Sequence, residues 1–579
     1  MGILNGIQTH KQIACLFRSL KHGTTFEWMK YQFRWFDAFY RQVFLTIFLI
    51  TNTVFLIYSA NYLFGNHDYN AVKHGISLTT WLWYGRYSNA LPLLITGGYL
   101  SPVINSILSI AAMSASSMLI CALFQVPKRK KYWIPACLIP MLLPYVVTWF
   151  YYSYETFSHT LLPVLAVGAI ALVRNKFNLE RFILSSGLIW FCLGVYPSVL
   201  AFLLLCIGGL FLFDLINRET FRTFCLRYAA VFFVVATSGI VFKGTIFVLR
   251  ASGKMSSTIY SLAMPSSPEL VRKFLPELLL SFKQFFHDTP YIPASLKLVL
   301  LAIIFTAVIL TAIQVVTTKN DLPPEQCFRD TPFKKAIRLF LLFMVWIGMF
   351  FATMIPDYLS QVEYPYVIRT AYFGVPFLTL IAATFIFRLG KKPLINIAAI
   401  LIVFILWCSS ISDLEIQKNW KIGFQNEILA YSRVLAMMEQ NPEVCALKSP
   451  ANYLQVGALP SGRIPFCRPK INDGISSFEL HSFEFNPDWS PRAGIVYDYL
   501  GSKFKWNYRG SFRVDSQEIS TFFDLKSPRW LAFLENACAY PAPPEQCLFV
   551  DPDSNSVVVV LNEEVLEQLK ADCGIVSTK

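Results

Sequence analysis

Runs of mostly apolar residues, each close to the length of a membrane helix, recur along most of this 579-residue chain. A helix that crosses the hydrocarbon core of a bilayer needs roughly 20 such residues, with a range of about 17–25. Hydrophobic residues make up 55% of the chain and charged residues only 15%, whereas about 25% of an ordinary soluble domain is charged. We therefore predict an all-α polytopic transmembrane bundle of about eleven helices. The predicted spans are 42–64, 103–124, 133–150, 161–173, 182–195, 198–215, 226–249, 296–316, 336–354, 371–387 and 393–412.

The loops between these runs carry much of the net charge of +14, which argues against a nucleic-acid partner. Short cytoplasmic loops are enriched in Lys and Arg, so the basic loops are expected to share the cytoplasmic side. A single bent helix over 182–215 would put one basic loop on the opposite side, and we therefore predict a hairpin at Tyr196-Pro197. The basic loop residues are Lys128, Arg129, Lys130, Lys131, Arg174, Lys176, Arg181, Arg218, Arg222, Arg227, Lys334, Lys335, Arg338, Arg388, Lys391 and Lys392.

This topology divides the chain into a cytoplasmic N-terminal segment at 1–41, a transmembrane domain at 42–412 and an extracytoplasmic C-terminal domain at 413–579. The last region is polar and contains turn-forming clusters. It also contains a strand-like run at 556–561, so we expect an α+β domain there. No cleavable signal is evident, and the first span is expected to remain as an anchor.

The C-terminal region contains cysteines, and an oxidising exterior permits disulfides between them. Their number is odd, which leaves one over, and spacing alone does not determine which of them pair. The pairs we expect are Cys445 with Cys467 and Cys538 with Cys547.

Ionisable residues at the outer ends of the predicted spans are the first candidates for chemistry. Asp68 follows the first span, and Glu155 lies in a very short aromatic outer loop. A carboxylate at the bilayer edge is partly desolvated, which raises its pKa toward the range useful for a general base. Arg369 is the basic residue of a late outer loop, and a guanidinium binds phosphate through paired N–H donors. The same residues also suit structural roles: a helix cap, a helix start and an interfacial anchor.

Further candidates lie in the same outer segments. Arg86 is a second candidate for phosphate binding, and His67 and Tyr154 stand next to the two carboxylates. The break at Tyr196-Pro197 is expected to line a cavity, because non-helical backbone at membrane depth is tolerated only there. A polar surface position for His67 and a plain tight turn at Tyr196 are the alternatives. No Cys/His spacing of the metal-binding finger type is present.

These segments together resemble the GtrII-type glucosyltransferase family, which modifies bacterial O-antigen and belongs to the GT-C class of membrane glycosyltransferases. The resemblance covers roughly residues 40–410. It rests on Asp68 after the first span, Glu155 ahead of an apolar span, the break at Tyr196 and Arg369 before an aromatic stretch. Related transferases often pair two acids after the first span, whereas Asp68 stands alone. Whether Asp68 acts alone or shares its role with Glu155 therefore stays open.

The resemblance implies a sugar donor linked to a polyprenyl phosphate, such as undecaprenyl phosphate glucose, in the bacterial inner membrane. The acceptor would be a hydroxyl of the lipopolysaccharide O-antigen on the periplasmic side, a change that converts serotype. Members of this family work beside a small lipid-sugar flippase and an enzyme that synthesises the donor, and they look metal-optional. In an inverting single displacement, Asp68 would be the base, Arg369 and Arg86 would bind the donor phosphate, and Glu155 would orient groups or share the acid role.

Two other membrane functions fit a polytopic chain. An O-antigen polymerase or ligase usually relies on a large outer loop rich in Arg and His, whereas the largest polar region here is C-terminal. A lipid-linked sugar transporter would tend to place charges at the bilayer midplane and to contain internal repeats. No repeat is evident in this sequence, which favours the transferase over the transporter. The two functions are kept as alternatives to the transferase.

Overall fold

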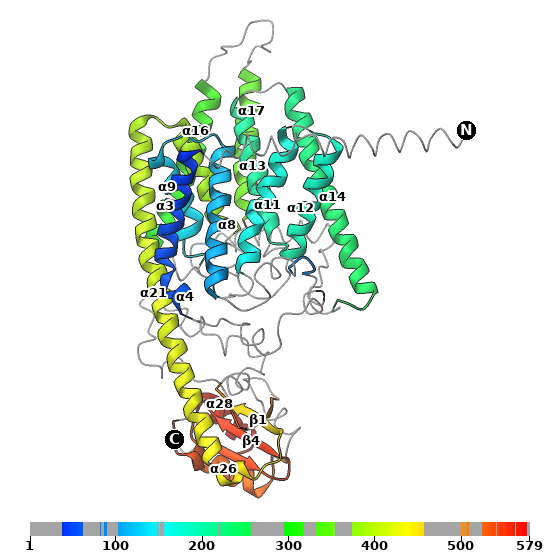
Figure 1. Ribbon diagram of the computed structural model, residues 1–579, viewed down its shortest axis with the longest axis vertical. Helices are drawn as coiled ribbons and strands as arrows, with labels where there is room; N and C mark the ends of the chain where they lie inside the picture. Colours follow the sequence, from blue (N-terminus) through cyan, green and yellow to red (C-terminus); the bar gives the residue numbers. More distant parts are fainter. Residues whose placement is uncertain are drawn as a thin grey trace, which may run out of the picture.

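The computed structural model describes residues 37–61, 82, 86–89, 102–146, 150, 156–175, 177–217, 221–255, 294–317, 332–353, 373–456, 500–503, 505–508, 524–539, 541–561 and 563–575. Most of these residues are helical, and the strands lie near the C terminus (Figure 1). The helices form an elongated bundle, and the strands lie beyond one end of it (Figure 1).

The bundle consists of helices that run roughly along its long axis (Figure 1). The helices are α3 Ala38–Val54, α4 Leu56–Ala60, α8 Pro102–Leu123, α9 Lys130–Leu142, α11 Thr156–Asn175, α12 Leu179–Val195, α13 Val199–Asn217, α14 Phe221–Ala251, α16 Ala294–Thr317, α17 Pro332–Ala352, α20 Val375–Leu389 and α21 Lys392–Gln440.

Seven of the described helices are long and apolar enough to cross a membrane: α8, α11, α13, α14, α16, α17 and the first half of α21. The other predicted spans fall on shorter helices, namely α3 with α4, α9, α12 and α20. The prediction of a helical membrane protein is therefore confirmed, whereas a total of about eleven spans stays a prediction.

The helices differ in how much of their surface faces outward. In the most apolar 18-residue stretch of α11, 78% is buried inside the protein. In the corresponding stretch of α17, 22% is buried. A helix that is apolar on all sides and still exposed requires an apolar surrounding. We infer that α14, α16 and α17 face lipid, while α8, α11 and α13 form the interior.

The first predicted span is broken rather than continuous, because α3 ends at Val54 and α4 begins at Leu56. In an uninterrupted helix the Tyr58 N–H would donate to the Val54 carbonyl oxygen. Instead the side-chain amide of Gln417 on α21 bridges these two groups. Gln417 Oε1 accepts from the Tyr58 N–H at 3.1 Å, and its Nε2 donates to the Val54 oxygen at 2.9 Å. A side chain inserted into the hydrogen-bond ladder is a recognised cause of a helix break.

The third predicted span, 133–150, is too long, because α9 ends at Leu142. The next residue, Leu143, is extended, with φ −71° and ψ 135°, and it precedes Pro144. The ring of a proline disfavours the helical conformation of the residue before it, which accounts for the earlier end.

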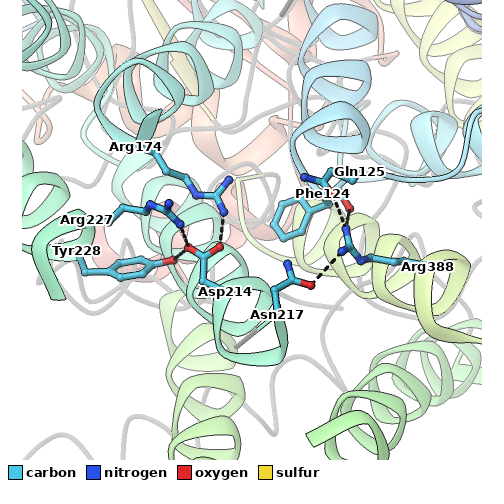
Figure 2. A network of polar contacts seen from close by, with 8 residues as sticks. All are labelled: Phe124, Gln125, Arg174, Asp214, Asn217, Arg227, Tyr228 and Arg388. Atoms are coloured by element: carbon cyan, nitrogen blue, oxygen red, sulfur yellow. Dashed lines mark hydrogen bonds and ion pairs between the residues drawn. The ribbon is translucent and has the colours of Figure 1, made fainter. Parts of the chain in front are cut away.

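The predicted hairpin at Tyr196-Pro197 is confirmed by contacts at the opposite ends of its helices. Asp214, near the end of α13, bonds both Arg174 at the end of α11 and Arg227 near the start of α14 (Figure 2). The last turns of α11 and α13 therefore lie at the same end of the bundle. This requires α12 and α13 to run in opposite directions, with Tyr196 at the far end.

Basic loop residues gather at the end of the bundle where Asp214 lies, which we call the basic end. Lys131 contacts Asn396 near the start of α21, at 3.3 Å. Arg388, at the end of α20, donates to Asn217 at 3.0 Å and also to the Phe124 carbonyl oxygen (Figure 2). These contacts join the basic-end termini of α8, α13 and α20, so the predicted placement of several basic loops on one side is confirmed for these residues.

The opposite end of the bundle faces the strands, and we call it the sheet end. Helix α21 starts at the basic end and continues beyond the bundle toward the strands (Figure 1). The four-stranded sheet has the order β2-β1-β4-β3. The strands are β1 Ala451–Val456, β2 Trp506–Tyr508, β3 Leu548–Asp551 and β4 Ser556–Val560. Strand β1 is parallel to β2 and β4, and β3 is antiparallel to β4.

Both faces of this sheet are covered by helices. On one face Tyr453 and Val557 pack against the last turns of α21 around Tyr431. On the other face alternate residues pack against α26 Pro528–Asn536 and α28 Glu563–Asp572. The predicted strand at 556–561 is therefore confirmed. Helix α21 runs without a break across the predicted boundary at 412/413, and its last turns cover one face of the sheet.

One predicted disulfide is wrong. Cys538 and Cys547 are both free thiols, and the Cys547 sulfur instead lies 3.6 Å from the Met437 sulfur on α21. Cys445 is also free and exposed, and its expected partner, Cys467, lies outside the described residues.

Candidate functional site

Two of the predicted site residues lie within the described part of the chain, and they are in contact. The Arg86 guanidinium carbon lies 5.1 Å from the centre of the Tyr196 ring. The distance is within the range of a cation–π interaction. The other predicted site residues, Asp68, Glu155, Arg369, His67 and Tyr154, lie outside the described residues.

Tyr196 is positioned by the local chemistry of the break between α12 and α13. It caps α12 with an extended backbone, φ −155° and ψ 111°, and its N–H still donates to the Cys192 oxygen. The following Pro197 favours this extended conformation. The Tyr196 carbonyl oxygen then accepts from the N–H of Val199, the first residue of α13, at 3.1 Å. The break therefore fixes an aromatic ring, with 9% of its surface exposed, at the sheet end.

Arg86 belongs to a short turn that is held against α12. The Asn89 N–H donates to the Arg86 oxygen at 3.0 Å, and the Ser88 N–H donates to the Gly194 oxygen at 3.2 Å. A Cβ at Gly194 would lie 2.5 Å from both Ser88 Oγ and Tyr87 Cζ, so the close approach of this turn requires glycine. The glycine at 194 and the turn at 86–89 thus form one packing unit.

The Tyr87 side chain anchors this turn on α12. Its ring lies 5.1 Å from the Trp190 ring on α12, and its hydroxyl donates to the Trp190 oxygen. Burial raises the pKa of Tyr87, so the hydroxyl is neutral at physiological pH and acts as a donor. The neighbouring Arg86 is therefore presented from a fixed backbone rather than from a free loop.

Other rings extend the surface around Tyr196. His159, near the start of α11, meets Tyr196 edge to face with ring centres 4.7 Å apart. Phe373, just before α20, lies 6.2 Å from the same ring. Separate segments around residues 86, 159, 196 and 373 therefore converge, and we call Arg86, His159, Tyr196 and Phe373 the Arg86 cluster. A guanidinium among aromatic rings suits a phosphate joined to a sugar, because rings stack on apolar sugar faces while N–H groups bind the oxygens.

Asn89, at the end of the same turn, was not predicted from the sequence. Its side chain is fully buried, and neither its amide oxygen nor its amide nitrogen has a hydrogen-bond partner among the described residues. Buried amides are rarely left without partners, so each such group requires an explanation. The sequence carries no signal for this, because an asparagine after an aromatic stretch is typical of any turn.

A second polar cluster lies at the basic end and has the character of a structural clamp. Asp214, with 1% of its side chain exposed, receives Arg174 on one oxygen (Figure 2). On the other oxygen it receives Arg227 at 3.1 Å and the Tyr228 hydroxyl at 2.8 Å (Figure 2). Each carboxylate oxygen is therefore engaged by groups of the protein itself. An isolated Asp at the end of an apolar run, as in the predicted span 198–215, was the available signal for it.

The described helices define an integral membrane protein with an arginine–aromatic cluster at one end. The family model described as glucosyl transferase GtrII matches residues 43–328, a region that includes Arg86, Asn89, His159 and Tyr196. This match confirms the predicted resemblance to the GtrII glucosyl transferase family. This family is one of glucosyltransferases, which require a sugar donor and an acceptor. No curated protein and no solved structure matches the chain.

Proposed function

We propose that this protein transfers glucose from a polyprenyl-phosphate donor to a hydroxyl of the lipopolysaccharide O-antigen, at the sheet end of the bundle. The observation that carries the proposal is the stacking of Arg86 on Tyr196 inside the region that matches the family. A membrane transferase that uses a lipid-linked donor needs a cation at the bilayer rim, where the phosphate leaves. In support of this role, the turn that carries Arg86 packs against α12.

The charges at the basic end support one orientation of the protein in the membrane. Lys and Arg in short loops favour the cytoplasm, and Lys131, Arg174 and Arg388 all lie at that end. The basic end would then face the cytoplasm and the sheet end the periplasm. In this orientation residues 1–41 are cytoplasmic and the C-terminal region, from 413 on, forms a periplasmic domain. The enzyme would sit in the bacterial inner membrane.

The proposed reaction is a single displacement that inverts the anomeric carbon. The acceptor oxygen forms a bond to C1 of glucose, the bond from C1 to the phosphate oxygen breaks, and the acceptor proton passes to a carboxylate. Asp68 is proposed as that base, with Glu155 orienting the acceptor or sharing the proton. Arg86 and Arg369 would stabilise the charge that develops on the departing lipid phosphate.

Aromatic residues at the sheet end would hold the sugar. Tyr196 is buried against His159 and Phe373, so its ring has a fixed orientation. Tyr154 and His67 are proposed as further lining residues. The donor is expected to arrive through the action of a lipid-sugar flippase and of a cytoplasmic enzyme that loads glucose onto the carrier.

The test uses purified protein in nanodiscs, synthetic polyprenyl phosphate carrying radiolabelled glucose, and lipopolysaccharide as the acceptor. The wild-type protein is expected to label the lipopolysaccharide. Arg86→Ala is expected to lower kcat/KM for the donor by roughly 10–150-fold, since a hydrogen bond to a charged group contributes about 1.5–3 kcal/mol. Arg41→Ala, an exposed arginine of α3, is the matched control and should retain activity.

Each alternative function has its own result in this assay. Polymerised O-antigen without glucose incorporation would indicate a polymerase or ligase. Movement of the labelled lipid between leaflets without transfer would indicate a transporter. Absence of labelled lipopolysaccharide with the wild-type protein would contradict the proposed function.

A further inference from the structure

Helix α21 carries a fully buried carboxylate, Asp413, near the sheet end of its membrane part. The side chain has no exposed surface, and neither carboxylate oxygen has a hydrogen-bond partner within the described residues. Asp413 follows Lys392, the first residue of α21, by 21 positions, which places it about 31 Å along the helix from the basic end. This is close to the roughly 30 Å thickness of the hydrocarbon core, so Asp413 lies near the rim of the membrane.

The residues one turn away on the same face of α21 show which way Asp413 is directed. Residues four apart share a helix face, and Ser409 and Gln417 flank Asp413 at this spacing. The Gln417 amide points into the bundle, where it bridges Val54 and Tyr58 at the break between α3 and α4. Asp413 therefore faces the interior of the bundle beside the first span.

Ser409 shares this unused hydrogen-bonding capacity with Asp413. The Ser409 hydroxyl is also fully buried without a partner in the described part of the chain. The Gln417 amide nitrogen is saturated, because its Nε2 donates both to the Val54 oxygen and to the Asp413 carbonyl oxygen. Gln417 thus has a structural role, and Asp413 and Ser409 do not share it.

Two buried aspartates in the described part of the bundle differ sharply in how they are accommodated. Asp214 at the basic end is engaged by two arginines and a tyrosine. Asp413 at the sheet end has no such partner among the described residues. A buried acid without partners destabilises the fold, whether it is charged or neutral. A group that lowers stability and is still present requires a role other than stability.

The chemistry of this position fits hydroxyl groups better than a metal ion. A divalent cation would need several oxygen ligands, and the described residues contain no group of three or more His, Cys, Asp or Glu that could hold one. Sugar hydroxyls both donate and accept, so they satisfy a carboxylate and a serine hydroxyl together. They also bring no charge to be buried. A sugar is therefore the ligand class that matches Asp413 and Ser409.

We propose that Asp413 is a sugar-binding residue of the transferase, which accepts hydrogen bonds from the hydroxyls of the glucose donor or of the acceptor glycan. This inference rests on the proposed function and assigns to it a residue outside the region that matches the family, which ends at 328. Asp413 would then hold one substrate from the α21 side of the bundle. Arg86 would hold the donor phosphate from the turn at 86–89.

The test compares Asp413→Asn and Asp413→Leu with the wild-type protein in the glucose-transfer assay and in thermal unfolding. We expect both variants to unfold at the wild-type temperature or above it, because an unsatisfied buried acid has been removed. We expect kcat/KM to fall roughly 10–150-fold in Asp413→Leu, mainly through a higher KM for one substrate. Asp214→Asn is the matched control, a buried acid whose loss should lower the unfolding temperature.

The outcomes separate this inference from the proposed function. Transfer by the wild-type protein with unchanged kcat/KM in both Asp413 variants would overturn the sugar-binding role and leave the proposed function intact. A fall in unfolding temperature as large as that of Asp214→Asn would show that Asp413 is structural, and this too would overturn the inference. Absence of transfer by the wild-type protein would overturn the proposed function, and the role of Asp413 with it.

Discussion

Replacement of Asp214 by asparagine is the perturbation whose effect the structure defines most closely. Asp214 joins the ends of α11, α13 and α14 through Arg174, Arg227 and Tyr228 (Figure 2). Asparagine has nearly the same shape, but it replaces one acceptor oxygen with an N–H donor. That donor would face groups that are themselves donors, and the two guanidinium charges would lose their counter-charge.

The expected loss follows from how deeply the network is buried. The side chain of Asp214 is 1% exposed, that of Arg174 is 12% exposed and that of Arg227 is 19% exposed. Removing one partner of a buried ion pair costs about 3–5 kcal/mol, because the remaining charge stays buried without compensation. An exposed pair would contribute only about 0–1 kcal/mol. We therefore expect Asp214→Asn to lower the free energy of unfolding by about 3–5 kcal/mol.

The assay is denaturant-induced unfolding in mixed micelles, followed by tryptophan fluorescence. A triple variant, Arg174→Met with Asp214→Leu and Arg227→Met, provides the control. Replacing a whole buried ion network by apolar side chains is often neutral or stabilising, so this variant should recover most of the lost stability. Wild-type stability in Asp214→Asn, or a further loss in the triple variant, would refute the assignment of a buried structural clamp.

Gln417→Leu should leave two backbone groups unpaired at the break between α3 and α4 and lower the free energy of unfolding by about 1–3 kcal/mol for each of them. The same denaturant titration measures this loss, and unchanged stability would contradict the bridging role. Gly194→Ala should lower glucose transfer, and overpacking against the neighbouring turn should lower the free energy of unfolding by roughly 1–3 kcal/mol. Gly187→Ala on the same helix should have little effect, because nothing lies within 4 Å of the new Cβ. Burial raises the pKa of the Cys547 thiol to about 11, so its alkylation rate should rise about tenfold per pH unit from pH 8 to pH 10 as the thiolate forms. Exposed Cys445 should react first at pH 8, and equal rates for the two, measured by peptide mass spectrometry, would contradict the buried position of Cys547.

The bundle could be predicted from the sequence as far as length, apolarity and loop charge determine it. The hairpin at Tyr196-Pro197 was predicted because only that arrangement keeps the basic loops on one side, and the contacts of Asp214 confirm it. The end of α9 at Leu142 was missed although Pro144 signals it locally. In that case the apolar run simply continues past the end of the helix.

Other features depend on contacts between distant residues and could not be predicted. The break between α3 and α4 is stabilised by Gln417, which lies more than 350 residues later in the chain. The domain boundary predicted at 412/413 follows the loss of apolarity and stays a prediction, while the helix α21 continues to Gln440 and covers one face of the sheet. Polarity along a helix reports what surrounds it and not where it ends.

The candidate site was predicted in part. Arg86 and Tyr196 were both selected from the sequence, and the structure places them in contact. Asn89 and Asp413 were not selected from the sequence, because what distinguishes them is burial without a hydrogen-bond partner in the described chain. Burial of this kind arises from packing, so it has no counterpart in the spacing of residues along the chain. The roles of Asp68, Glu155 and Arg369 stay predictions.

Photo-crosslinking of the lipid phosphate tests most directly where transfer takes place. A polyprenyl phosphate with a diazirine next to its phosphate would be irradiated with the wild-type protein in nanodiscs, and the modified peptides would be identified by mass spectrometry. We expect adducts at the sheet end, within 86–89 and around Tyr196. Adducts confined to the basic end, around Arg174 and Asp214, would contradict it.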